Sequence, residues 1–136
     1  MTQYWLMKSE PDDCSIDDAL AAPDATVPWT GVRGFQARNF MGKSMQVGDG
    51  VLFYHSSCPQ PGIVGVARVA SGPRPDKPRW VLVDVQAVRK TRLLSLPEMR
   101  ATPELADMVV LRRGNRLSIT PVEEKHWKQI VDGMLA

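Results

Sequence analysis

Short runs of aromatic and β-branched residues, separated by turn-forming residues, are the feature that most limits how this chain can fold. Four runs have the length and composition of β-strands: Tyr4–Lys8, Val51–Tyr54, Ile63–Val69 and Trp80–Val88. Two shorter runs, Met108–Leu111 and Leu117–Ile119, complete the set. Most of these runs are joined by turns rather than by helices. We therefore expect an α+β fold of the small mixed β-barrel type, with five or six strands. Inside one strand, Gly65 predicts a bulge or a close backbone approach.

About three helices are expected beside this barrel. Ser15 is a candidate N-cap for a helix that ends before Pro23, and two acidic residues lie in its first turn. A short helix is expected to begin after Ser95. The residues Thr120–Glu123 have the pattern of a capping box that opens a final helix. The segment Phe35–Lys43 is expected to be helical in part.

Composition indicates one soluble globular domain that spans residues 1–136. Hydrophobic residues make up 43% of the chain and charged residues 24%, which is ordinary for such a domain. The net charge is only +2, but residues 25–116 are basic and both ends are acidic. A basic central region favours an anionic partner, most simply nucleic acid. Alternatively, several of its arginines protect strand edges against aggregation.

The two cysteines, Cys14 and Cys58, are too few for a disulfide framework and have no zinc-ligand spacing. Charged residues at Lys8 and Glu10 interrupt any N-terminal apolar segment, and the uncharged stretch 50–67 contains polar residues and prolines. We therefore expect a cytoplasmic protein that does not act at a membrane and carries no metal and no cofactor.

Motifs of the common enzyme classes are not found in the sequence. It has no nucleophile elbow, no phosphate-binding loop and no dinucleotide-binding glycine pattern. His55 and Cys58 stand close together, but a nucleophile and base need a third group that orients them, and none is evident. We therefore do not expect an enzyme. His55 is interpreted as a hydrogen-bonding side chain at a strand end, and His126 as a helix surface or boundary residue.

The segment from Trp29 to Phe40 has an unusual mixture of residues. It combines an exposed-looking tryptophan with two arginines, a glutamine and an asparagine: Arg33, Arg38, Gln36 and Asn39. Aromatic faces stack on flat ligands, amides read polar edges, and arginines bind phosphate. The segment therefore predicts one wall of a pocket for a flat polar ligand. The alternative is a solvated loop with one packed tryptophan.

Three further elements at predicted strand ends could complete this pocket. They are Lys8-Ser9-Glu10-Pro11, Tyr54-His55-Ser56 and Arg116-Leu117-Ser118. Loops at strand ends commonly form binding sites, and converging polar groups in a partly apolar slot are typical of ligand pockets. Each element has another reading, because Ser9 could cap, Tyr54 could be core and Arg116 could pair with a carboxylate.

Taken together, these motifs resemble the EVE domain family over nearly the whole chain and in the same order. The matching segments are Tyr4–Pro11, Trp29-x-Gly-Val-Arg33, Gln36–Asn39, Val47–Asp49, Phe53–Ser56, Gly65 and Arg116–Val122. The resemblance implies a PUA-like fold related to the YTH domain, and a reader of a modified base rather than a catalyst. In two places the sequence departs from the family pattern. Gly34 and Phe35 replace the usual Asn and Tyr, and the connector Gly72–Arg79 is short.

The resemblance implies that a flipped base of DNA or RNA stacks on Trp29. Polar edge contacts are then expected from six residues: Lys8, Ser9, Glu10, Gln36, Asn39 and His55. Phosphate contacts are expected from Arg33, Arg38 and Arg116. The remaining expected lining is Pro11, Val32, Tyr54, Ser56 and Ser118. Two alternatives stay open, a protein-interaction or regulatory module and a small-molecule enzyme that uses His55. A monomer is favoured.

Overall fold

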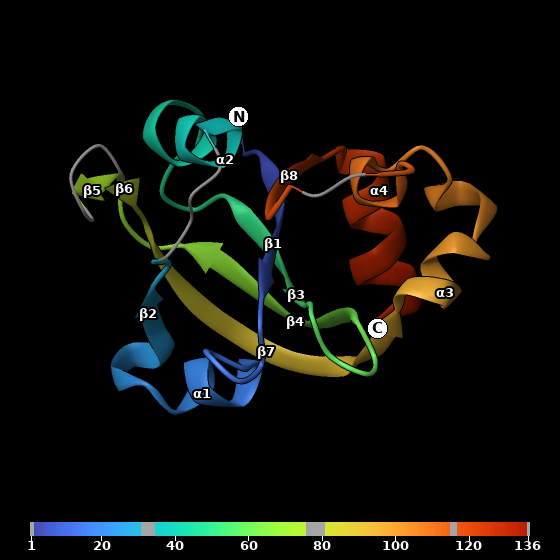
Figure 1. The fold of residues 1–136 in the computed structure, drawn as a ribbon, viewed down its shortest axis with the longest axis horizontal. Coiled ribbons are helices and arrows are strands. Elements are labelled where there is room, and N and C mark those ends of the chain that lie inside the picture. The colour runs from blue at the N-terminus through green and yellow to red at the C-terminus, as the bar shows by residue number, and fades with distance from the viewer. Residues whose placement is uncertain (1, 31–34, 76–80, 115–116, 136) are drawn as a thin grey trace.

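One six-stranded sheet forms the centre of the computed structural model, which describes residues 2–30, 35–75, 81–114 and 117–135 (Figure 1). Its strands are β1 (Tyr4–Ser9), β2 (Thr26–Pro28), β3 (Gly50–His55), β4 (Gly62–Val69), β7 (Asp84–Ser95) and β8 (Ile119–Val122). Their order across the sheet is β2-β7-β4-β3-β1-β8. A separate short pair consists of β5 (Arg74–Pro75) and β6 (Val81–Leu82).

The sheet is open, so the expected closed barrel is wrong, although the mixed α+β class is confirmed. Strands β2 and β8 lie at opposite edges and are not paired with each other. Each edge strand contains a proline, Pro28 or Pro121, which has no N–H to donate to a further strand. Only β1 and β3 run parallel, while the other pairs within this sheet are antiparallel.

Helices cover both faces of the sheet. They are α1 (Ile16–Ala21), α2 (Phe35–Asn39), α3 (Leu96–Arg100) and α4 (Glu124–Lys128). Two of them continue as wider π-helical turns, α2 into η2 (Phe40–Ser44) and α4 into η5 (Gln129–Met134). Short 3₁₀ turns are η1 (Pro23–Ala25), η3 (Pro103–Leu105) and η4 (Val109–Leu111). Among the described residues, no helix is long and apolar enough to span a membrane.

The predicted caps of α1 and α3 are confirmed. The Ser15 side chain accepts a hydrogen bond from the N–H of Asp18, whose carboxylate accepts from the N–H of Ser15, so the two form a capping box. Ser95 caps α3 in the same way, by accepting from the N–H of Glu98. Both helices are therefore fixed at their N-termini by local sequence.

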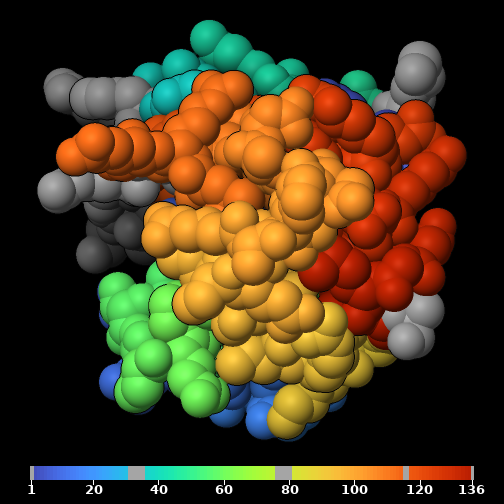
Figure 2. Space-filling view, turned by 90° about the vertical axis from the view of Figure 1, so that its right-hand side faces the viewer, coloured from blue at the N-terminus to red at the C-terminus, as the bar shows by residue number. Residues whose placement is uncertain are grey.

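Each face of the sheet has its own apolar core. Along β1 and β3, Trp5 and Phe53 belong to one core, which α1 and α2 cover, whereas Leu6 and Leu52 belong to the other, under α3 and α4. This alternation follows from the two-residue period of a strand. Figure 1 shows α1 on one side of the sheet and α3 and α4 on the other. In Figure 2, the second face is covered by the orange α3–η4 region and the red C-terminal helix.

Several element boundaries differ from expectation. Strand β7 continues to Ser95 instead of ending at Val88, and Val109–Leu111 is a 3₁₀ turn rather than part of a strand. The residues Thr120–Val122 belong to β8, and the last helix begins after Glu123, whose side chain makes no capping hydrogen bond. Proline fits the start of a helix and an edge strand equally well, so the capping-box interpretation was wrong. Trp80 lies outside the described residues.

Gly65 confirms the expected close approach. The register between β4 and β7 shifts at Gly65. A Cβ added to Gly65 would lie 2.5 Å from Ile16 Cδ1 and 2.9 Å from the carbonyl oxygen of Arg89. The absence of a side chain here lets α1 pack directly against β4.

We predict that Gly65→Ala destabilises the protein, because the new methyl group overpacks a rigid backbone contact. Overpacking of this kind typically costs about 1–3 kcal/mol. Urea denaturation measures the change in the free energy of unfolding. Gly72→Ala is the matched control, because a Cβ at the exposed Gly72 meets nothing within 4 Å. Equal stability of the two variants would contradict the packing argument.

Candidate nucleic-acid interface

A pocket of about 550 Å³ lies at the C-terminal end of β1. We call it the β1-end pocket. Its lining comes from the end of β1, the turn that follows, the end of β2 and the start of the β8 segment: Lys8, Ser9, Glu10, Asp13, Cys14, Val27, Pro28, Trp29, Thr30 and Ser118. This volume is in the usual range of small-molecule sites. Five of the residues expected at a site are therefore brought together here: Lys8, Ser9, Glu10, Trp29 and Ser118.

Backbone pairing brings the predicted strand ends together. The parallel register places Ser9 opposite His55. The N–H of Ser56 donates to the carbonyl of Ser9 at 2.9 Å, and the N–H of Lys8 donates to the carbonyl of Ser118 at 2.8 Å. Three segments that are far apart in sequence therefore meet at the C-terminal ends of β1 and β3.

The turn after β1 supplies two pocket residues that the sequence analysis did not identify. The N–H groups of Asp13 and Cys14 both donate to the carbonyl of Glu10 at 2.9 Å, and the Ser9 hydroxyl donates to the carbonyl of Cys14 at 2.6 Å. These bonds fold the turn back over the strand end. The signal was present in the sequence, because Pro11 and the Ser15 cap leave only a short turn between strand and helix.

Trp29 lines the pocket but is only 6% exposed, which differs from its exposed-looking sequence context. Its ring packs edge-on against Phe53, with 5.3 Å between the ring centroids. The backbone N–H of Trp29 donates to the carbonyl of Val83 at 2.9 Å. The pairing of β2 with β7 therefore carries Trp29 into the core, as the packed-tryptophan alternative proposed.

Tyr54 lies in the core on the opposite face of the sheet and is 3% exposed. The ammonium of Lys8 lies 5.8 Å from the centroid of the Tyr54 ring, a weak cation–π geometry. Burial lowers the pKa of Lys8 from its ordinary value. It also raises the pKa of Tyr54. Tyr54 therefore has the core position that was its alternative interpretation.

His55 caps helix α1 rather than lining the β1-end pocket. Its Nε2 accepts a hydrogen bond from the N–H of Ile16 at 3.1 Å. It lines a neighbouring pocket of about 600 Å³ together with Pro11, Cys58 and Lys90. Burial lowers the pKa of His55, and a neutral imidazole is the form that can accept this bond. The strand-end hydrogen bond expected of His55 is thus present.

The remaining expected residues lie elsewhere. Arg38 and Asn39 line a groove beside η2, and Gln36 is exposed on α2. Ser56 is half-buried and uses its N–H in the bond to Ser9. The other three, Val32, Arg33 and Arg116, lie outside the described residues.

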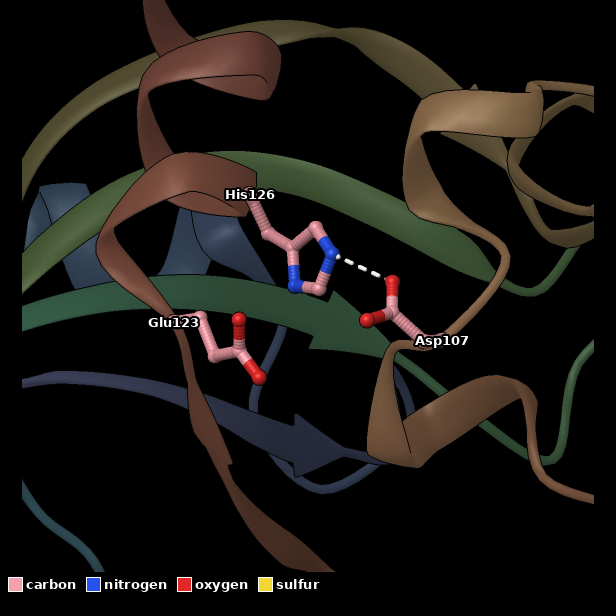
Figure 3. Close-up of side chains that lie close together, drawn as sticks. All are labelled: Asp107, Glu123 and His126. Atoms are coloured by element: carbon pink, nitrogen blue, oxygen red, sulfur yellow. Dashed lines mark hydrogen bonds and ion pairs between the residues drawn. The ribbon is translucent and has the colours of Figure 1, made fainter.

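A group of Asp107, Glu123 and His126 is the one cluster of potential metal ligands found among the described residues, with ligand atoms within 4.8 Å of one another (Figure 3). His126 Nε2 lies 2.9 Å from Asp107 Oδ1. The ammonium of Lys125 lies 3.2 Å from Asp107 and 3.5 Å from Glu123. The Lys125 ammonium and His126 therefore already pair with these carboxylates, so the three residues fit a structural tie better than a metal site.

His126 holds the last helix to the turn after η3. Its side chain is 2% exposed, so the expected surface position is wrong. Hydrogen bonds from Lys125 and His126 lower the pKa of Asp107. The burial arises because Asp107, nineteen residues away, supplies the partner that a buried imidazole needs.

The fold and the pocket define an α+β domain with an open sheet and a mixed polar and aromatic pocket where its central parallel strands end. A model of the EVE domain family matches residues 3–133, and the chain belongs to this family. The resemblance found in the sequence is thereby confirmed.

Relatives in other organisms share both sequence and fold. Mouse thymocyte nuclear protein 1 is 34% identical over 167 positions, which cover 96% of this chain and 73% of the mouse protein. A crystal structure from Pseudomonas putida is 40% identical with a TM-score of 0.87, covering 95% of this chain and 97% of that one. The structure of human THYN1 in complex with DNA containing 5-methylcytosine is 33% identical, with a TM-score of 0.87 and 96% of each chain covered.

We predict that the His55 cap makes stability fall with decreasing pH. Folding lowers the pKa of His55 by burial. The contribution of His55 to the free energy of unfolding is therefore fully present above its unfolded-state pKa of about 6.5, and it is lost as pH falls toward the lower pKa of the folded state. The midpoint temperature of thermal unfolding should therefore fall more between pH 7.5 and pH 5 for the wild type than for His55→Gln. The glutamine carbonyl can still accept from Ile16 but does not titrate. Parallel pH curves would contradict this role.

Proposed function

We propose that this domain binds nucleic acid and takes one modified base into the β1-end pocket. The observation that carries the proposal is the pocket itself, in which Trp29 lies beside hydroxyl and carboxylate groups. The DNA complex of human THYN1, which contains 5-methylcytosine, supports the same partner. We take 5-methylcytosine as the first base to test.

The lining chemistry suits a pyrimidine with an exocyclic amino group. Carboxylates accept hydrogen bonds from the amino group of cytosine, and Glu10 and Asp13 supply two carboxylates. The oxygen of Ser9 keeps acceptor capacity after its proton is used toward Cys14. On the other side, Val27, Pro28 and Trp29 offer apolar surface to a methyl group.

Binding requires that the contacts of the flipped base in the pocket release more free energy than flipping costs. Flipping a base out of a duplex costs a few kcal/mol, and stacking on an aromatic side chain returns about 1–3 kcal/mol. Since Trp29 is 6% exposed, a full stacking face would need its neighbouring side chains to rearrange. The edge contacts must therefore contribute much of the remaining affinity.

We predict that the protein binds an oligonucleotide with one 5-methylcytosine about tenfold more tightly than the same oligonucleotide with cytosine. One methyl group in an apolar pocket is worth about 1–3 kcal/mol. Fluorescence anisotropy with matched duplex and single-stranded probes, in DNA and RNA form, measures the ratio. Equal affinities for all methylated and plain pairs would exclude selective reading of this base.

A negative charge at the pocket mouth should weaken binding to any nucleic acid. Thr30 is exposed and lines the pocket, so Thr30→Glu places a carboxylate near the incoming strand. Lys128→Gln is the control, because it lowers the net charge by the same amount and Lys128 is exposed on α4, over the second face of the sheet. Anisotropy titration should show a loss of affinity for Thr30→Glu alone. An equal loss in both variants would indicate an effect of total charge and contradict the location of the site.

A further inference from the structure

A second groove, with a different charge, lies beside the β1-end pocket. It has a volume of about 540 Å³ and is lined by η2, the end of α2 and the β5–β6 pair: Arg38, Asn39, Gly42, Lys43, Pro73, Arg74, Pro75 and Val81. We call it the basic groove. Three of these residues are cationic, and none of the lining residues that the structure describes is acidic.

The β1-end pocket has the opposite electrostatic character. Its lining includes the carboxylates of Glu10 and Asp13. Carboxylates accept from a base amino group but repel phosphate. A nucleotide held in this pocket must therefore keep its phosphates outside, and the phosphates need cations nearby.

Backbone geometry places the two sites next to each other. The backbone N–H of Trp29, which lines the pocket, donates a hydrogen bond to the carbonyl of Val83. Val81 of the groove is two residues earlier, at most about 7 Å along the chain. A Cβ on Gly42 would lie 3.7 Å from Val81 Cγ2, so η2 packs against this strand and forms the other wall.

We infer that the basic groove binds the phosphate backbone of the nucleic-acid strand whose base enters the β1-end pocket. This inference rests on the proposed function. Lys43 is exposed and supplies a mobile ammonium group, while Arg74 keeps further N–H donors although one nitrogen pairs with Asp84 at 2.6 Å. Pro73, Pro75 and Val81 offer apolar surface to the sugars. In the sequence, Pro73–Pro75 lie within the short connector Gly72–Arg79, which gave no indication of this groove.

The test removes one cation from the groove and leaves the pocket intact. Lys43→Gln should weaken binding about fivefold at 0.15 M salt, because each phosphate contact contributes about 0.9 to the slope of log K against log salt. That slope should become shallower by about one. The loss should be the same for methylated and plain oligonucleotides, since the groove does not contact the base. Lys43→Glu should weaken binding further.

Lys128→Gln is the matched control. Lys128 is an exposed lysine on α4, far from β5 and β6 in Figure 1, and its loss changes the net charge equally. Unchanged affinity and salt slope in Lys43→Gln, or the same loss in Lys128→Gln, would overturn the inference. In that case, a preserved preference of the wild type for the methylated probe would leave the proposed function standing. If Lys43→Gln binds more weakly but the wild type shows no preference, the groove is supported and base reading fails.

Discussion

A buried carboxylate, Asp49, holds together the starts of the two parallel strands, β1 and β3, and the rest of the fold depends on this contact. Asp49 is 2% exposed and accepts three hydrogen bonds. They come from the indole of Trp5 at 3.0 Å, the N–H of Gln3 at 3.1 Å and the N–H of Gln46 at 2.9 Å. A buried charge is tolerated only with such partners. Because β1 and β3 run parallel from this point, the register set here places Ser9 opposite His55 at the C-terminal ends of the two strands.

The parallel pair also explains where one wall of the pocket comes from. Parallel neighbours need a long crossover connection, and residues 10–49 form it between β1 and β3. This connection carries α1 and α2 onto one face of the sheet and adds β2 at its edge (Figure 1). Trp29 lies within it and returns to the end of β1, where it lines the pocket beside Ser9. The requirement for a crossover thus produces the pocket without any dedicated additional domain.

Local signals in the sequence were sufficient for β1, β3 and β4, for the Ser15 cap and for the close approach at Gly65, because each depends on residues near in sequence or on a single steric property. Non-local pairing decided the rest. Trp29 is buried because β2 pairs with β7, and His126 is buried because Asp107 reaches it. Tyr54, by contrast, is placed on the second face by the local two-residue period of β3. The sheet is open because β2 and β8, which contain Pro28 and Pro121, remain unpaired edge strands, and no local pattern in the sequence identifies them as edges.

Charge separation between the pocket and the groove makes a small net charge compatible with binding a polyanion. The whole chain carries only +2, so long-range attraction is weak. At physiological salt, however, charges are screened beyond about 8 Å, so the field at the groove depends mainly on nearby charges such as Arg38, Lys43 and Arg74. The carboxylates of Glu10 and Asp13 would oppose a phosphate inside the pocket but not a base. On the proposed function, nucleic-acid affinity depends on contacts at the two adjacent sites rather than on total charge.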